Sequence, residues 1–217
     1  MLNSVIFDMD GLLIDSEPYW QKAGISVLSD FGVNISVEQY YSSTGLRTRE
    51  WLEFWLTNFN ISVEGAEKAV TKIEDRAIEL IRESAVAFPG TDHVLNFFKD
   101  RDFKIGLATS SPLRLVDVVV EKLGITHFFD AFSSAEFLPQ GKPHPQVYLN
   151  CAEALDVSPL QCVCFEDSFH GFIAAKAARM KCVVVPEESL INQPRWHAAD
   201  LKLASLAEFD AEMLGQL

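Results

Sequence analysis

The chain has 217 residues, of which 48% are apolar and 23% are charged, and its net charge is −13. This composition is globular, and the length suffices for one sizeable domain with a smaller inserted one. The acidic surface disfavours nucleic acid and anionic membranes as partners, but a phosphorylated small molecule can still bind where cations and backbone N–H groups gather.

The first predicted element is a short buried strand over residues 4–7. Asp8 follows this strand directly, before the turn residue Gly11. Similar apolar runs, each too short for an independent helix, recur at residues 104–108, 161–165 and 181–185.

From residue 16 to residue 88 helical periodicity replaces the strand-like runs. One apolar stripe consists of Trp51, Phe54, Trp55 and Phe59. A second, longer stripe consists of Ala66, Ala69, Val70, Ile73, Ala77, Leu80 and Ile81. We interpret residues 16–88 as an all-helical insertion, in which the aromatic stripe serves packing; the alternative is a platform for a ligand.

After residue 88 helical and strand patterns alternate. One helix is predicted by apolar residues at helical spacing, with Ser111 as its N-cap, Pro112 at its first position and Gly124 as its stop. From Leu201 the chain has a strand fragment and a closing helix. This alternation predicts an α/β fold with a doubly wound, mainly parallel sheet.

The expected domains follow from this change of pattern. Residues 1–15 and 89–217 form the α/β core, and residues 16–88 form an inserted helical cap domain. In a parallel sheet, functional sites lie at the carboxyl ends of the strands. The side chains that follow each predicted strand are therefore the candidates for chemistry.

Asp8 and Asp10 are two positions apart at the end of the first predicted strand. On a continuing strand such residues share a face, so both carboxylates can address one reacting centre. Aspartate is also common in turns, so a cap or a solvated loop is the alternative. A calcium loop is excluded, because the further acidic positions and the terminal glutamate are missing.

Two later segments carry further polar candidates. Thr109 and Ser110 follow the second predicted strand, at residues 104–108, and precede a helix N-terminus, where free N–H groups attract phosphate. The alternative role for these hydroxyls is helix capping. Lys142 lies between Gly141 and Pro143 in a loop that two prolines stiffen, although a surface lysine is the default.

Glu166 and Asp167 end another strand as two adjacent acids. Together with Asp8 and Asp10 they concentrate negative charge at a cost that a metal ion would offset.

This combination resembles the haloacid dehalogenase superfamily, whose four motifs all occur in order, and the insertion resembles that of its small-cap branch. The resemblance covers essentially the whole chain. The segments that are similar to the subgroup acting on hexitol phosphates and 2-deoxyglucose 6-phosphate are FDMDGLLIDSEPYW, TGLR, SAEFLPQGKPHPQVYL, EDSFHG and AAKAARMKCVVVP.

The resemblance implies that Asp8 is a nucleophile that forms an aspartyl-phosphate, and that Asp10 is the general acid and base. It implies that Thr109 and Lys142 hold the phosphoryl oxygens, with Ser110 beside them. It also implies a Mg²⁺ ion. The expected ligands are the Asp8 carboxylate, the Asp10 backbone carbonyl and Asp167, with Glu166 as a further ligand or directly behind the ligands.

Two positions in the insertion bear on the substrate. Arg47, in the stretch Thr44-Gly45-Leu46-Arg47, matches a segment that contacts substrate in related enzymes, and Arg49 is a second candidate; the alternative is that both are solvated arginines. Trp20 stands where related β-phosphoglucomutases carry a histidine, which favours hydrolysis over phosphoryl shuttling. His144 and His170 match no ligand position, and we expect both in loops.

We therefore expect a Mg²⁺-dependent phosphatase of a small phosphorylated metabolite. The alternatives are a phosphosugar mutase, a dehalogenase and a catalytically silent binding protein. The chain has no apolar run of about 20 residues and no secretory leader, so we expect a cytoplasmic monomer without membrane or nucleic-acid partners. We expect the four cysteines, none of them in a CxxC pair, to be buried and reduced.

Overall fold

The computed structural model describes all 217 residues and contains one six-stranded sheet. Its strands follow the order β3-β2-β1-β4-β5-β6, and each neighbouring pair is parallel. The strands are β1 (Ser4–Phe7), β2 (Lys104–Thr109), β3 (Ala131–Ser134), β4 (Cys162–Glu166), β5 (Lys181–Val184) and β6 (Leu201–Lys202).

Nine α-helices surround or extend this sheet. They are α1 (Glu17–Asp30), α2 (Val37–Tyr41), α3 (Thr48–Asn58), α4 (Ala66–Ser84), α5 (Thr91–Lys99), α6 (Leu113–Leu123), α7 (Gln146–Ala154), α8 (Phe169–Ala177) and α9 (Ala211–Gly215). None of them has both the length and the apolar character needed to cross a membrane.

The sheet is covered on both faces, because successive strand residues belong to different cores. Phe7 of β1 packs in a cluster with Phe98 of α5 and Val119 of α6. The preceding residue, Ile6, packs in a second cluster with Tyr148 of α7 and Phe172 of α8. A strand buried on both faces is apolar nearly throughout, which explains the uninterrupted apolar runs in the sequence.

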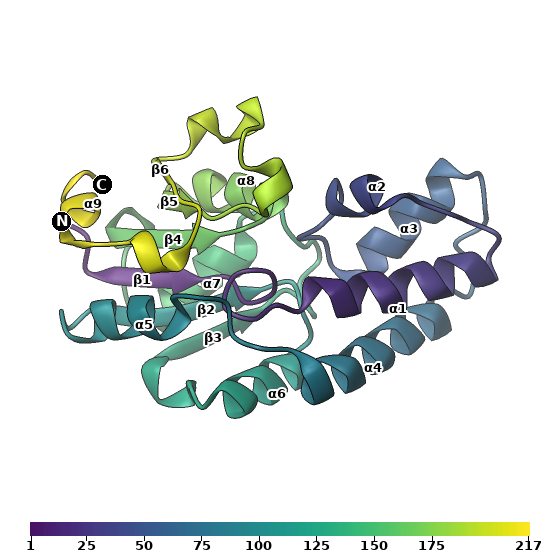
Figure 1. Cartoon of the computed structure of the whole chain (residues 1–217), viewed down its shortest axis with the longest axis horizontal. Coiled ribbons are helices and arrows are strands. Elements are labelled where there is room, and N and C mark those ends of the chain that lie inside the picture. The colour runs from purple at the N-terminus through teal and green to yellow at the C-terminus, as the bar shows by residue number, and fades with distance from the viewer.

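Helices α1 to α4 form the helical insertion and lie beyond the carboxyl ends of the strands (Figure 1). Within it α1 packs along α4 and α3 packs on both. At Gly24 of α1 a Cβ atom would lie 2.7 Å from the Trp51 ring, so glycine permits the close approach of α1 to α3. The insertion thus forms a wall that faces the strand ends, and its boundaries as a separate domain stay a prediction.

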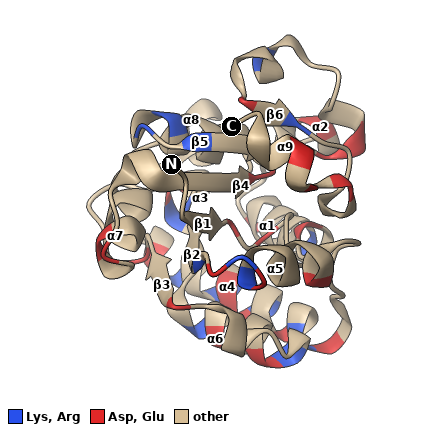
Figure 2. Ribbon diagram, turned by 90° about the vertical axis from the view of Figure 1, so that its left-hand side faces the viewer, with Lys and Arg blue, Asp and Glu red and all other residues tan.

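The structure confirms the predicted α/β class, the parallel sheet and the helical character of the insertion. It also confirms that all four cysteines are free and buried. The sequence did not reveal β3, because two of its four residues are serines and the segment lacks an apolar run. Charged residues lie mainly on helices and loops (Figure 2). Glu166 is an exception as the last residue of β4.

Three local predictions were wrong. Helix α6 begins at Leu113 with Pro112 as its N-cap, so Ser111 does not cap it. The aromatic stripe of α3 is narrower than predicted, because Phe54 and Phe59 are exposed. His170 lies in α8 and not in a loop.

Candidate active site

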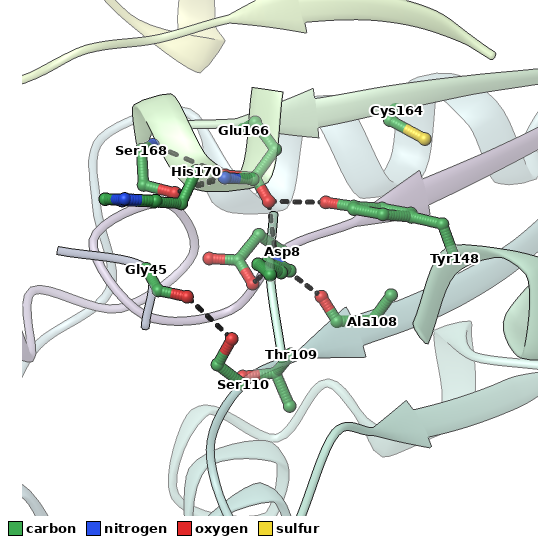
Figure 3. A network of polar contacts seen from close by, with 12 residues as sticks. Asp8, Gly45, Ala108, Thr109, Ser110, Tyr148, Cys164, Glu166, Ser168 and His170 are labelled. Atoms are coloured by element: carbon green, nitrogen blue, oxygen red, sulfur yellow. Dashed lines mark hydrogen bonds and ion pairs between the residues drawn. The ribbon is translucent and has the colours of Figure 1, made fainter. Parts of the chain in front are cut away.

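A buried lysine lies between two carboxylates at the carboxyl end of the sheet. The Lys142 side chain is 1% exposed, and its Nζ donates to Asp8 Oδ1 and Glu166 Oε1, each at 2.6 Å. The third donor of Nζ binds the Ala108 carbonyl oxygen at 3.1 Å. Figure 3 shows Asp8, Glu166 and Ala108 converging on this position. Lys142 is therefore a fixed internal cation, and the alternative of a surface lysine was wrong.

Glu166 uses both of its carboxylate oxygens within the protein. Oε1 accepts hydrogen bonds from Lys142 and from the Tyr148 hydroxyl, and Oε2 accepts from the Ser168 amide and hydroxyl at 3.3 and 3.1 Å. A Cβ atom at Gly171 would lie 1.8 Å from Oε1, so only glycine leaves room for the carboxylate. Glu166 thus holds Lys142 in place and has little capacity left for another ligand.

One carboxylate oxygen in the acidic cluster at the strand ends has no hydrogen-bond partner. Ligand atoms of Asp8, Glu166 and Asp167 all lie within 4.8 Å of one another. Asp167 Oδ1 is buried and has no hydrogen-bond partner. A buried carboxylate oxygen without a partner is costly, and oxygen donors at this spacing suit a hard divalent cation. The residues therefore fit the ion that the family resemblance implies.

Burial and neighbouring charges shift the pKa values of this cluster. Burial raises the pKa of Asp8 to about 8, although the charge of Lys142 opposes this rise. Burial also raises the pKa of Asp167 well above its usual range, and the charges of Asp8 and Glu166 raise it further. Burial alone would lower the pKa of Lys142, but Asp8 and Glu166 outweigh it and raise this pKa, so the lysine stays charged. A cation bound to the acids would counter their uptake of protons.

Three side chains orient the Asp10 carboxylate. Oδ1 accepts hydrogen bonds from the Ser16 hydroxyl at 2.7 Å and the Trp20 indole at 2.9 Å. Oδ2 accepts from the Ser111 hydroxyl at 2.7 Å. Sequence reasoning missed these roles for Ser16 and Ser111, which local patterns present only as a cap or a loop residue. Trp20 was singled out only because it replaces a histidine.

The two predicted hydroxyl candidates differ in their contacts. Thr109 is 1% exposed, lines the cavity described below, and accepts a hydrogen bond from the Ser111 amide at 3.0 Å. Ser110 donates from its hydroxyl to the Gly45 carbonyl at 2.7 Å and so joins the core to the insertion. Figure 3 shows this contact beside Thr109. Contact of either residue with phosphate stays a prediction.

Arg47 contacts the loop that leads to Lys142. Its guanidinium donates to the carbonyl oxygens of Ala135 (3.1 Å) and Leu138, and it pairs with Glu50 at 2.6 Å. The same Glu50 oxygen accepts a hydrogen bond from the Gly141 amide at 2.9 Å. Arg47 does not line the cavity. As a substrate contact it stays a prediction.

Two other residues named from the sequence also lie outside the cavity. Arg49 is half exposed and pairs with Glu67 at 2.6 Å on the outer surface of the insertion, so its predicted contact with substrate has no support from this geometry. The His170 Nδ1 atom lies 2.8 Å from the Thr44 carbonyl oxygen and adds a further contact between core and insertion.

A cavity lies between the strand ends and the insertion. From the core it is lined by Asp8, Asp10, Thr109, Ser110, Lys142 and Asp167. The insertion contributes Glu17, Trp20, Tyr40 and Trp51, among others. Sequence reasoning brought the core residues together correctly but missed Glu17, Tyr40 and Trp51, because helical periodicity does not indicate which site a helix will face.

Comparison with known proteins identifies the family of this chain. A family model for haloacid dehalogenase-like hydrolases matches residues 2–179. The chain is 43% identical to hexitol phosphatase B of Escherichia coli (strain K12) over 97% of this chain and 96% of that protein. It is 31% identical to a fructose-1-phosphate phosphatase of the same strain, over 83% of this chain and 95% of that protein.

A solved structure supports the same assignment. The chain matches a β-phosphoglucomutase from Clostridium difficile with a TM-score of 0.88 and 27% identity, over 100% of this chain and 96% of that one. The chain thus resembles known proteins in sequence and in fold, and it belongs to the haloacid dehalogenase-like hydrolases.

Proposed function

We propose that the protein is a Mg²⁺-dependent phosphatase that hydrolyses a sugar or sugar-alcohol phosphate through a phosphoryl-aspartate on Asp8. One observation carries this proposal: the Asp8 carboxylate lines the cavity, pairs with the buried cation of Lys142, and lies within 4.8 Å of the Asp167 carboxylate, which has an unpaired oxygen. The similarity to hexitol phosphatase B supports the choice of substrate class.

Charge compensation is the first requirement of this chemistry, since an anionic ester must approach an anionic attacker. Lys142 supplies one fixed positive charge 2.6 Å from Asp8. The Asp8 and Asp167 carboxylates, with the Asp10 carbonyl, would hold Mg²⁺, which would supply a second positive charge to offset the negative charge of the ester. The hydrogen bonds that Glu166 makes to Lys142, Tyr148 and Ser168 favour a role in fixing Lys142 over direct binding of the ion.

Proton transfer falls to Asp10. Asp8 Oδ attacks phosphorus while the bond to the sugar oxygen breaks, and protonated Asp10 gives that oxygen its proton. Water then attacks phosphorus, Asp10 takes its proton, and the bond to Asp8 breaks to release phosphate. Two of the three groups that bind Asp10 are the hydroxyls of Ser16 and Ser111, which can rotate and accept a hydrogen bond when Asp10 is protonated.

A phosphosugar mutase is the second candidate, favoured by the structural similarity to a β-phosphoglucomutase. A mutase that works through a sugar bisphosphate must bind a second phosphate. Lys142 is the only basic residue among those that line the cavity, and its charge already pairs with Asp8 and Glu166. This supports hydrolysis.

The test is release of inorganic phosphate by the purified chain from hexitol and hexose phosphates in Mg²⁺, without any bisphosphate. A phosphatase releases phosphate at once and leaves the dephosphorylated sugar. Isomerised sugar phosphate that accumulates only when a bisphosphate is added would establish the mutase instead.

A further inference from the structure

The wall that the insertion contributes to the cavity contains a glutamate that the chemistry above does not use. Glu17, the first residue of α1, lines the cavity, and its Oε2 accepts a hydrogen bond from the Tyr40 hydroxyl at 2.9 Å. Tyr40 is 6% exposed and lines the same cavity. Glu17 Oε1 makes no hydrogen bond within the protein, so one oriented acceptor remains free.

An unpaired donor lies in the same wall. Trp51 is 7% exposed and lines the cavity, and its Nε1 is buried without a hydrogen-bond partner. Its ring packs edge-to-face on Tyr40, with 5.9 Å between the ring centroids, so the three side chains are contiguous. An unmade hydrogen bond of a buried donor is costly.

The wall therefore offers a free acceptor and a free donor, and a hydroxyl group supplies the complement of both. A second anionic group on the ligand would instead meet the Glu17 carboxylate, with no unengaged cation among the residues lining the cavity. The polarity of this wall thus matches an uncharged leaving group with several hydroxyls.

We propose that Glu17, oriented by Tyr40, accepts a hydrogen bond from a hydroxyl of the leaving group and selects uncharged polyol phosphates against esters with a second anion. Trp51 donates to a further oxygen of the same group. This inference rests on the proposed phosphatase function and names the substrate class of its site.

The test compares kcat/KM for three phosphate esters in Mg²⁺ at pH 8, where Glu17 is ionised. Sorbitol 6-phosphate has a neutral polyol leaving group, p-nitrophenyl phosphate lacks an aliphatic hydroxyl, and phosphoglycolate carries a carboxylate. Two ratios are measured. The sorbitol ratio is kcat/KM for sorbitol 6-phosphate divided by kcat/KM for p-nitrophenyl phosphate, and the phosphoglycolate ratio is defined in the same way. A ratio cancels losses that affect all substrates equally.

Two substitutions of Glu17 separate its two roles. Glu17→Ala removes the acceptor and lowers the sorbitol 6-phosphate ratio about ten- to a hundredfold, the loss for a hydrogen bond to a charged group. Glu17→Gln keeps an acceptor oxygen but removes the charge, so it raises the phosphoglycolate ratio about tenfold and changes the sorbitol ratio less than Glu17→Ala does.

Tyr40→Phe removes the hydrogen bond that orients Glu17 Oε2, so it lowers the sorbitol ratio by a smaller factor than Glu17→Ala does. Glu83→Gln, an exposed substitution on α4, is the matched control for charge and moves neither ratio.

Unchanged ratios in both Glu17 variants would overturn the inference, and so would equal losses on all three esters, while the phosphatase proposal would stand. Absence of phosphate release by the unmodified chain from every ester would overturn both. Circular dichroism checks folding, and Tyr40→Phe provides the test if a Glu17 variant does not fold.

Discussion

Lys142 illustrates how much of this site depends on single buried contacts. Its three ammonium donors are all used, by Asp8, Glu166 and the Ala108 carbonyl. Glu166 is itself held by Tyr148 and by Ser168. Because a buried charge without its partner is strongly destabilising, the network keeps the lysine in one position. In the proposed mechanism, Asp8 therefore already has a fixed cation beside it when the substrate arrives.

Asp8→Asn is expected to abolish phosphate release and to leave the protein folded. The amide cannot act as the nucleophile, whereas Lys142 keeps Glu166 as its partner. Phosphate release with Mg²⁺ and circular dichroism measure the two properties, and Asp117→Asn, an exposed change on α6, is the control. Turnover comparable to that of the unmodified chain would remove Asp8 from the role of nucleophile.

A pH-dependent stability difference is expected from Glu17. Burial, followed by the charge of Asp10, raises the pKa of Glu17 from 4.5 to about 7 in the folded protein. The folded state then binds more protons than the unfolded state between these values, so the contribution of Glu17 to stability is present below pH 4.5 and is lost as pH rises through 7.

The measurement is the melting temperature of the unmodified chain and of Glu17→Gln at pH 5 and pH 8, without divalent ions. The Glu17→Gln variant cannot ionise at this position. Its melting temperature minus that of the unmodified chain is therefore higher at pH 8 than at pH 5. The expected change is about 3 °C or more, which corresponds to about 1 kcal/mol in a chain of this size. A difference that is the same at both pH values would mean that Glu17 titrates normally in the folded protein.

At the scale of elements, α3 is attached to the loop that carries Lys142. Arg47 precedes α3 and binds carbonyl oxygens of residues 135–139, and Glu50 in its first turn accepts from the Gly141 amide. A Cβ atom at Gly141 would lie 2.4 Å from the Glu50 carboxylate, so glycine permits this contact. The insertion and the lysine loop are therefore positioned together.

Arg47→Ala separates this contact from the substrate contact expected from the sequence. If Arg47 acts by positioning the loop, kcat falls by the same factor, about tenfold, for a hexitol phosphate and for p-nitrophenyl phosphate, because Lys142 serves both. We expect this outcome, with Arg76→Ala, an exposed change on α4, as the control. A loss confined to the hexitol phosphate would instead place Arg47 against the leaving group.

At the scale of the whole molecule, the acids at the strand ends come from β1 and β4, which are neighbours only in the folded sheet. A divalent cation that binds them therefore binds the folded state and stabilises it. Their repulsion and the unpaired Asp167 oxygen both oppose folding in its absence.

Addition of MgCl₂ is expected to raise the melting temperature of the unmodified chain, and chelation is expected to abolish phosphate release. Asp167→Asn weakens the ligand set, so its melting temperature responds much less to MgCl₂. Differential scanning fluorimetry over a MgCl₂ series measures this without reference to activity. An equal response in both proteins would show that the ion binds elsewhere.

The sequence by itself determined the α/β class, the helical character of residues 16–88 and the positions of Asp8, Thr109, Glu166 and Asp167 at the ends of buried strands or directly after them. These features depend on local periodicity, because a strand buried on both faces must be apolar and its first polar residues mark its end. Only the tertiary structure decided the partners of these residues.

Ser111 contacts Asp10 across 101 positions, and Arg47 contacts Leu138 across 91. No local pattern encodes such pairs, since each depends on how separate elements pack. For the same reason, only the packing of the helices shows that Glu17, Tyr40 and Trp51 line one wall of the cavity. Periodicity determines which side of a helix is buried, whereas packing determines what that side faces.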